Sequence, residues 1–185
     1  MAKNLKQLPS GSPLQSTDLM YVVRPADSDT TADKQIPLSD VISYGRAYGQ
    51  IYLTLGANPT QSVTATPTAI TAYDTEGISV GMTLSAAAGT ITVDPSTISN
   101  VAWVGFSLSG SYSANATISI AIYKNSIVTG LAGIIDLTNN NIDAGNLSVS
   151  GIGTYSPNDV YEVRIWASAA GTFTFNSLML GIGSI

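Results

Sequence analysis

The segment that most strongly indicates a β fold is residues 160–180, VYEVRIWASAAGTFTFNSLML. In its first part every second residue is apolar, at Tyr161, Val163 and Ile165, which is typical of a strand with one buried face. Residues 168–171 then predict a short turn, because they are small and end in Gly171. Residues 172–182 continue with aromatic and apolar residues, so the sequence predicts two strands joined as a hairpin.

The second of these strands has apolar residues on both faces. The apolar residues occupy odd-numbered positions at Phe173 and Phe175 and even-numbered positions at Leu178, Leu180 and Ile182. Either the strand is buried on both sides, or a β-bulge near residues 176–177 resets its register. We favour burial on both sides, as at a subunit interface.

Eight further segments of residues 50–185 have a strand-like composition and are separated by Gly, Asn or Pro. They are residues 51–55, 68–73, 81–84, 90–93, 102–109, 116–124, 134–137 and 147–151. In residues 116–124 the side chains of Ile118, Ile120 and Ile122 share one face, which we expect to face the core. Residues 56–67 are predicted to be a polar connection. This spacing of short strands, with no sustained period of 3.6 residues, predicts an all-β antiparallel sandwich or barrel.

The chain carries unusually little charge. Only 10% of its residues are charged and its mean hydropathy is +0.24, whereas the surface of a small soluble domain is usually about 25–35% charged. No stretch approaches the ~18 consecutive apolar residues of a membrane span. The excess apolar surface therefore predicts burial between subunits. The alternative is a monomer whose surface is polar through Ser and Thr.

The distribution of charge argues against two classes of partner. Residues 1–49 contain five Lys or Arg and five Asp, so the net charge of −5 arises entirely in residues 50–185. An acidic region with few cations does not suit nucleic acid or an anionic membrane. The chain has no Cys, and residues 1–6 do not lead into a secretory signal, so we expect synthesis and assembly in a cytoplasm.

Residues 1–49 differ in character from the rest and are expected to form an N-terminal attachment segment. Residues 18–23 and 34–36 predict two short strands, and residues 38–44 predict a short helix that begins at Ser39 and stops at Gly45. Such a segment is too small to bury a core of its own, so it should dock on something larger.

This segment resembles the N-terminal region of bacteriophage virion proteins found in tail fibres, head fibres and capsid decorations. The resemblance lies in a Leu-Pro start, an Asp-Leu-x-x-Val strand and a Leu-Ser-Asp helix start. The residues that carry it are Leu8, Pro9, Asp18, Leu19, Val22, Leu38, Ser39 and Asp40. The resemblance implies that these residues attach the protein to the particle. The alternative is a local hairpin that packs on its own domain.

Residues 50–185 resemble the trimeric jelly roll of the tumour-necrosis-factor and complement globular-head type. The resemblance lies in the order of four segments, residues 106–110, 118–125, 147–151 and 159–166. It implies a ten-stranded antiparallel jelly-roll sandwich that forms a homotrimer around a threefold axis. One departure is Asn158, where a Gly is expected before the strand.

The residues available for chemistry are few. With no His and no Cys, the usual nucleophile–base pairs and most transition-metal sites cannot form. The nearest carboxylate pairs, Asp74 with Glu76 and Asp159 with Glu162, lie on single strands and do not flank a sugar cleft. We therefore expect no enzymatic activity and no cofactor.

One loop has partial calcium-loop spacing. Asn139, Asn141 and Asp143 stand at alternating positions, as the first ligands of such a loop do, but Ala144 and Ser150 replace the Gly and Glu that it requires. We interpret it as an Asn-rich connection and expect no metal.

The exposed face of the strand at residues 160–167 is a candidate contact surface. Glu162, Arg164 and Trp166 share it, and this combination suits either a sugar or a subunit interface. We favour an interface. The hypothetical trimer interface therefore consists of these three residues with Leu178, Leu180 and Ile182, at or near the threefold axis.

Together these features predict a non-enzymatic structural protein on the virion surface of a tailed phage. The favoured role is a homotrimeric capsid decoration or cement protein whose partners are its own copies and the major capsid protein. The alternative is a head or tail fibre that binds a host glycan and attaches through tail or portal proteins.

Overall fold

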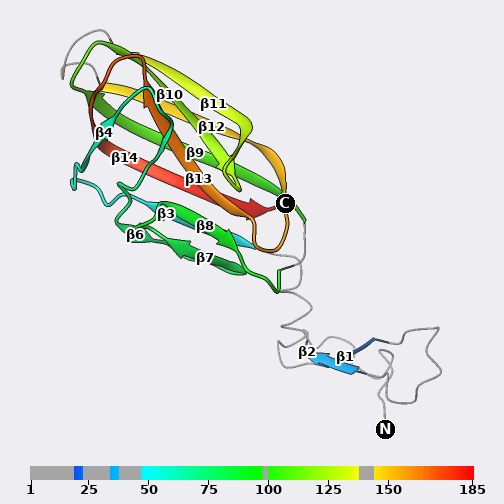
Figure 1. The fold of residues 1–185 in the computed structure, drawn as a ribbon. Helices are drawn as coiled ribbons and strands as arrows, with labels where there is room; N and C mark the ends of the chain where they lie inside the picture. Colours follow the sequence, from blue (N-terminus) through cyan, green and yellow to red (C-terminus); the bar gives the residue numbers. More distant parts are fainter. Residues whose placement is uncertain (1–18, 23–33, 38–46, 98–99, 138–143) are drawn as a thin grey trace. The chain divides into compact units, whose positions relative to one another are not determined.

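The computed structural model describes residues 19–22, 34–37, 47–97, 100–137 and 144–185, and the chain forms two compact units, Met1–Tyr44 and Gly45–Ile185. In the first unit, β1 (Leu19–Val22) pairs antiparallel with β2 (Lys34–Pro37), and Leu19 lies opposite Pro37 (Figure 1). These strands correspond to the two predicted there. The predicted helix over residues 38–44 lies outside the described residues.

The second unit, which we call the body, contains two antiparallel sheets of six strands each among the described residues. The first sheet has the order β12 (Ala144–Tyr155), β9 (Asn100–Tyr112), β14 (Gly171–Ser184), β3 (Tyr48–Tyr52) and β6 (Thr75–Glu76), with β4 (Thr60–Val63) also paired to β14. The second has the order β11 (Ile127–Leu137), β10 (Ala116–Lys124), β13 (Val160–Ala167), β8 (Thr90–Val93) and β7 (Met82–Ser85), with β5 (Thr68–Ala69) also paired to β13.

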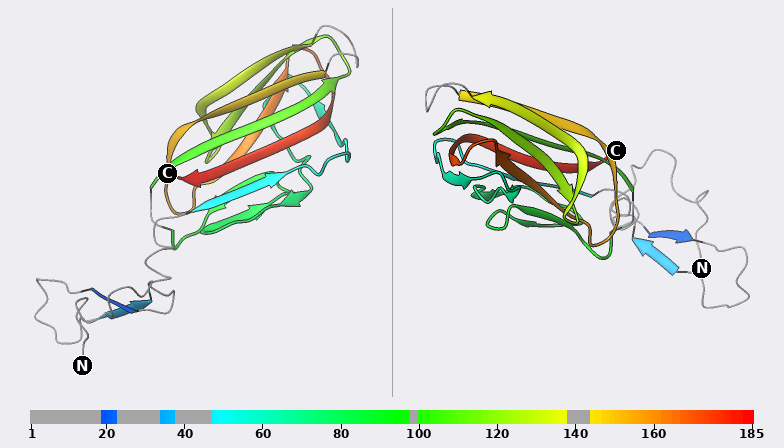
Figure 2. Two further views of the ribbon diagram at one scale, coloured as in Figure 1. Left: turned by 180° about the vertical axis from the view of Figure 1, so that it is seen from behind. Right: turned by 45° about the horizontal axis from the view of Figure 1, so that its top comes forward.

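The chain crosses repeatedly between the sheets. From β9 it enters the second sheet as β10 and β11, returns as β12, crosses again as β13 and ends in the first sheet as β14. The left view of Figure 2 looks onto the first sheet, where β12, β9, β14 and β3 lie side by side. The body is thus an antiparallel jelly-roll β-sandwich. The predicted all-β jelly-roll class is confirmed, with twelve strands among the described residues where ten were expected.

The prediction that residues 160–182 form a hairpin is wrong. β13 pairs with β10, β8 and β5, whereas β14 pairs with β9, β3 and β4, so the two strands belong to different sheets. The short connection between them carries the chain across the core, and its Ala169 carbonyl accepts a 2.7 Å hydrogen bond from the Tyr112 hydroxyl. A period of two shows that a segment is a strand but does not identify its partner.

The preference for a two-sided last strand is also wrong, because β14 contains the alternative bulge. Its register against β9 shifts between Phe175 and Ser177. The side chains of Phe173, Phe175, Leu178, Leu180 and Ile182 consequently all lie buried in the core, each at most 3% exposed. The one extra residue at the bulge shifts the alternation of side chains by one position, so that odd-numbered residues before it and even-numbered residues after it face the core.

Several strand boundaries differ from those predicted. β4 lies within the segment expected to be a connection, β11 starts at Ile127 instead of residue 134, and β12 runs from Ala144 instead of residue 147. β12 contains much Gly and Ser, which have low strand propensity, so its composition predicts a shorter strand than the structure has. The longer strand forms because β12 pairs with β9 along its whole length.

The core between the sheets confirms the most regular predicted strand. Ile118, Ile120 and Ile122 of β10 are all fully buried. In the same core, the aromatic rings of Phe173 and Phe175 are tilted by 47° to each other, with centroids 4.7 Å apart. The turn before β13 also forms without the expected Gly, because Asn158 adopts a left-handed φ of 68°, which Asn tolerates better than most residues.

Candidate functional site

The outward side of the first sheet has an unusual surface, which we call the uncharged face. It consists of the outward side chains of β12, β9, β14 and β3, and none of these four described strands contains Asp, Glu, Lys or Arg. The alternation of side chains along each strand positions them: on β9, for example, Ala102 and Val104 are buried, while Val101 and Trp103, which alternate with them, are over 40% exposed.

One end of the uncharged face is apolar. A single cross-strand row joins Tyr48 of β3, Gly183 of β14, Trp103 of β9 and Ile152 of β12. Tyr48 is 40% exposed, Trp103 41% and Ile152 74%. Towards the other end the rows become serine-rich, so the face changes from apolar to polar without acquiring charge.

A hollow of about 350 Å³ opens in the apolar end. Tyr48 and Trp103 lie on either side of it, Gly181 and Gly183 lie beneath it, and Ile78 stands at its rim. A Cβ atom added to Gly183 would meet its nearest neighbour, the Tyr48 Cβ, only at 3.9 Å. The hollow therefore exists because the floor has no side chains, and it is large enough for one apolar side chain from another molecule.

The outward side of the second sheet is different because it carries charge. Arg164 donates from Nε to Glu162 Oε1 at 2.9 Å, and its guanidinium lies 4.5 Å from the centre of the Tyr123 ring. Trp166 is half-buried on the same face. The predicted contact residues Glu162, Arg164 and Trp166 thus lie together, and the two charges neutralise each other within the subunit.

The other three predicted interface residues lie elsewhere. Leu178, Leu180 and Ile182 belong to the first sheet and point into the core, where the chain's own side chains cover them. The structure therefore does not unite the six predicted residues on one surface, and these three offer no area to a second subunit.

The predicted attachment residues are described only in part. Leu19 and Val22 lie in β1, opposite Pro37 and Lys34. The remaining predicted residues, Leu8, Pro9, Asp18, Leu38, Ser39 and Asp40, lie outside the described residues, as do Asn139, Asn141 and Asp143 of the Asn-rich loop.

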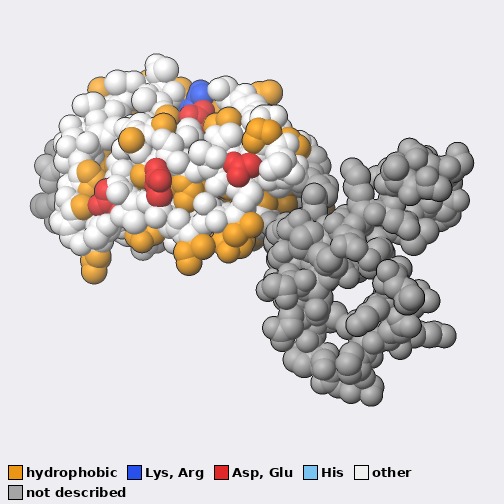
Figure 3. All heavy atoms as spheres, turned by 90° about the horizontal axis from the view of Figure 1, so that it is seen from below, with side chains coloured by type: hydrophobic (Ala, Val, Ile, Leu, Met, Phe, Trp, Pro, Cys, Tyr) orange, Lys and Arg blue, Asp and Glu red, His pale blue; other side chains and the backbone are white. Residues whose placement is uncertain are grey.

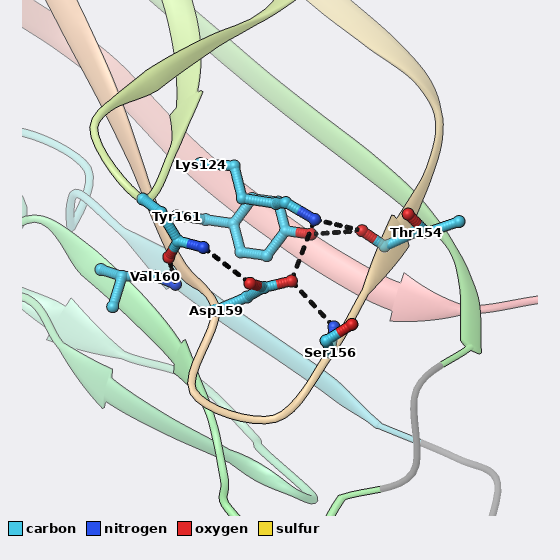
Figure 4. A network of polar contacts seen from close by, with 7 residues as sticks. Lys124, Thr154, Ser156, Asp159, Val160 and Tyr161 are labelled. Atoms are coloured by element: carbon cyan, nitrogen blue, oxygen red, sulfur yellow. Dashed lines mark hydrogen bonds and ion pairs between the residues drawn. The ribbon is translucent and has the colours of Figure 1, made fainter.

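A network around Asp159 holds the end of the sandwich together (Figure 4). Asp159 is 7% exposed and accepts hydrogen bonds from Asn125 Nδ2 at 2.7 Å and from the Ser156 amide at 2.8 Å. Lys124 Nζ lies 3.0 Å from Asp159 Oδ2, the oxygen that also accepts from the Ser156 amide, and Lys124 Nζ donates as well to the Thr154 carbonyl. Burial acts to raise the pKa of Asp159, but the bonds from Lys124, Asn125 and Ser156 outweigh it, so the pKa lies below 3.8.

The carboxylates considered for catalysis serve as hydrogen-bond acceptors within the fold. Asp74 accepts from the Thr54 amide at 2.7 Å and from the Thr75 hydroxyl at 2.8 Å, and these bonds lower its pKa below 3.8. Glu76 accepts from the Ala86 amide at 3.1 Å. Among the described residues, no group of three or more His, Cys, Asp or Glu lies close enough to hold a metal.

Charged side chains are few on the body as a whole. Figure 3 shows one side of it, where single acidic side chains are scattered and a basic side chain lies beside an acidic one. Within the described residues, no helix is long and apolar enough to cross a membrane.

Comparison with known proteins gives structural similarity alone. No protein-family model matches the sequence, and no curated protein matches it. The structure is similar to that of the tumour-necrosis-factor protein Eiger from S. frugiperda, at 12% identity over 76% of this chain and 93% of that chain, with a TM-score of 0.48. It is similar also to the globular domain of the zebrafish complement 1qA protein, at 11% identity over 73% of this chain and 94% of that chain, with a TM-score of 0.48.

The uncharged face was missed in the sequence because its strands lack a clear amphipathic pattern. Small residues occupy many of its positions, as at Gly105, Ser107 and Ser109 of β9. A usable signal was nevertheless present: residues 100–112, 144–155 and 171–184 contain no charged residue.

Proposed function

We propose that the protein is a non-enzymatic virion structural protein of a tailed phage, a homotrimer that decorates the capsid and stabilises the assembled head. The observation that carries the proposal is the uncharged, partly apolar face of the first sheet. An exposed Trp103 beside Tyr48 and Ile152 is costly for a monomer and is typical of an association surface. The resemblance of residues 8–40 to phage attachment segments is the reason for placing the protein on the phage particle.

The mechanism is mass action. A protein that binds the assembled shell but not its dissociated subunits shifts the equilibrium towards the shell. Three attachment segments on one trimer would bind neighbouring capsomers with a high effective local concentration, so that modest single contacts give tight binding. The division of the chain into two compact units, Met1–Tyr44 and Gly45–Ile185, supports separate roles for attachment and assembly.

A head or tail fibre is the second candidate, and the outward side of β13 favours it. There Trp166 lies half-buried on the same side as the paired Glu162 and Arg164, and an aromatic ring beside polar groups suits a sugar ring. This surface would recognise a host glycan, and the attachment segment would then bind tail or portal proteins.

Binding to capsids that lack the protein tests the favoured role. We expect the intact chain to bind and to raise the temperature at which the capsids disrupt, whereas a chain lacking residues 1–44 should keep its circular dichroism spectrum and lose binding. Equal binding by the shortened chain would exclude the attachment role. Tight binding of the shortened chain to host cells, abolished by Trp166→Ala, would support the fibre instead.

Light scattering tests the assembly. A trimer has about three times the chain mass of 19.1 kDa, and a mass equal to that of one chain would exclude the proposed trimer.

A further inference from the structure

Large side chains facing glycines close one flank of the sandwich, where β11 and β12 end the second and the first sheet. In each contact a large side chain of one strand lies over a glycine of the other. The pairs are Gly133 with Leu147, Gly145 with Ile135 and Gly151 with Leu131. A Cβ atom added to any of these glycines would lie within 2.7 Å of the side chain that covers it, so the flank is filled at these three points.

This series of contacts stops at the next position on each strand. Gly153 follows Gly151 on the same side of β12, and Thr129 precedes Leu131 on the same side of β11. Beyond its chain neighbours, a Cβ atom on Gly153 would meet no atom within 4 Å, and the Thr129 hydroxyl donates to the Ile122 carbonyl at 2.9 Å. No large side chain fills this point, and a pocket of about 280 Å³ lies there, lined by both Gly153 and Thr129. We call it the edge pocket.

The edge pocket is apolar on one part of its lining and polar on the other. Its apolar part includes Leu131 and Val104, a core residue that is only 3% exposed. Its polar groups come together at Thr154, whose carbonyl accepts hydrogen bonds from Lys124 and from Tyr161, each at 3.0 Å (Figure 4). An apolar pocket with a few fixed polar groups is the usual form of a small-molecule site.

Lys124 determines which polar group a ligand needs. An ammonium group has three N–H donors, and among the described residues two of them are used, towards Asp159 Oδ2 and the Thr154 carbonyl. The Lys124 side chain is 31% exposed, and Asp159 is not part of the pocket lining. The third N–H can therefore donate to a ligand, and a carboxylate is the acceptor with which it forms the strongest hydrogen bond.

The volume of the edge pocket limits the size of the ligand. An apolar cavity of about 150 Å³ can hold a benzene molecule, so 280 Å³ has room for a six-carbon chain or ring together with a carboxylate. We propose that the edge pocket binds a small alkyl or aryl carboxylate, with its hydrocarbon part against Val104 and Leu131 and its carboxylate at Lys124. This inference does not depend on the proposed assembly or on the phage particle.

A series of carboxylates tests the proposed site in the full chain, with binding followed by the shifts of amide signals in NMR spectra. The affinity should rise about fourfold for each CH₂ group from propanoate to hexanoate, as expected when each added group is buried. It should level off in longer chains, once the pocket is full. Hexan-1-ol, which lacks the carboxylate, should bind about tenfold more weakly or worse. Shifts that do not saturate, or equal binding of hexan-1-ol and hexanoate, would overturn the inference.

Filling the edge pocket gives an independent test. Gly153→Leu supplies the missing large side chain where a Cβ atom has room, so it should keep the circular dichroism spectrum and abolish hexanoate binding. Gly153→Val, a smaller change, should weaken that binding. Thr92→Leu, on the outward side of the second sheet, is the matched control and should bind hexanoate as tightly as the unmodified chain. Unchanged binding by folded Gly153→Leu or Gly153→Val would show that hexanoate binds elsewhere and would rule out the edge pocket.

Discussion

Asp159 shows how one buried carboxylate fixes the end of the sandwich. It joins Asn125, at the turn after β10, to Ser156 at the end of β12, and so links the two sheets through side-chain and backbone bonds. Its pKa below 3.8 means that folding favours the ionised form. The resulting stability is present above the unfolded pKa and is lost as the pH falls through the folded pKa.

We expect Asp159→Asn to lower the free energy of unfolding by about 2 kcal/mol at neutral pH, the value typical of hydrogen bonds to a charged group. The difference from the unmodified protein should shrink as the pH falls below about 5, because the unfolded chain then binds a proton at this carboxylate before the folded protein does. Urea denaturation at fixed protein concentration measures both effects. Asp136→Asn, at an exposed position bonded to Thr117, is the control, and an equal loss there would contradict the assignment.

Two buried tyrosines form a natural comparison. The Tyr112 hydroxyl donates to the Ala169 carbonyl at 2.7 Å, whereas the fully buried Tyr155 hydroxyl has no hydrogen-bond partner among the described residues. We expect Tyr112→Phe to cost about 1 kcal/mol and Tyr155→Phe to cost nothing or to stabilise. Thermal denaturation of both variants checks this, and a larger loss for Tyr155→Phe would show that its hydroxyl is bonded.

At the scale of the element, β14 depends on its bulge and on the glycine opposite it. Gly110 of β9 pairs with Phe175, immediately before the register shift. A Cβ atom there would lie 2.2 Å from the Thr174 carbonyl oxygen and 2.4 Å from the Phe173 ring. The close approach lets two phenylalanines enter the core from one short segment.

Gly110→Ala should therefore destabilise the body by about 1–3 kcal/mol, or more if β14 cannot shift. Gly153→Ala is the matched control, because a Cβ atom on Gly153 meets no other atom within 4 Å. Guanidinium denaturation distinguishes them. Equal stability of the two variants would mean that the backbone at the bulge adapts without cost.

The elements also show what the sequence could and could not predict. β10 and β13 have the predicted bounds, because strict alternation around Ile120 and Val163 marks a strand unambiguously. The pairing partner of β13 could not be predicted, because side-chain period carries no information about the neighbouring strand. The change of parity before Leu178 was seen, but burial on two sides and a bulge at residue 176 give the same pattern.

At the scale of the whole molecule, the site was the harder part to predict. The sequence predicted Trp166 and Arg164 as contact residues because an aromatic and a charged residue on one strand face are typical of binding surfaces. The uncharged face depends on small residues such as Gly181 and Gly183, and its hollow arises only when three strands bring them beside Tyr48 and Trp103.

The salt dependence of self-association distinguishes two possible assembly surfaces, the uncharged face and the outward side of the second sheet. Raising NaCl from about 0.1 M to about 1 M shortens the screening length from about 10 Å to about 3 Å. An uncharged contact should keep or slightly increase its affinity, as measured by sedimentation across a dilution series. A tenfold weakening would instead indicate a contact through Glu162 and Arg164, and Glu162→Gln would then abolish the salt dependence.

The place of β14 in the first sheet also governs when the body can fold. β14 lies between β9 and β3, yet it follows both of them in the chain by more than fifty residues. While the ribosome is still making residues 171–184, Ile51 of β3 and Phe106 of β9 have no central strand to cover them. The sandwich therefore closes only after the last strand has left the exit tunnel, and each new copy passes through a state with an open core before it can meet another.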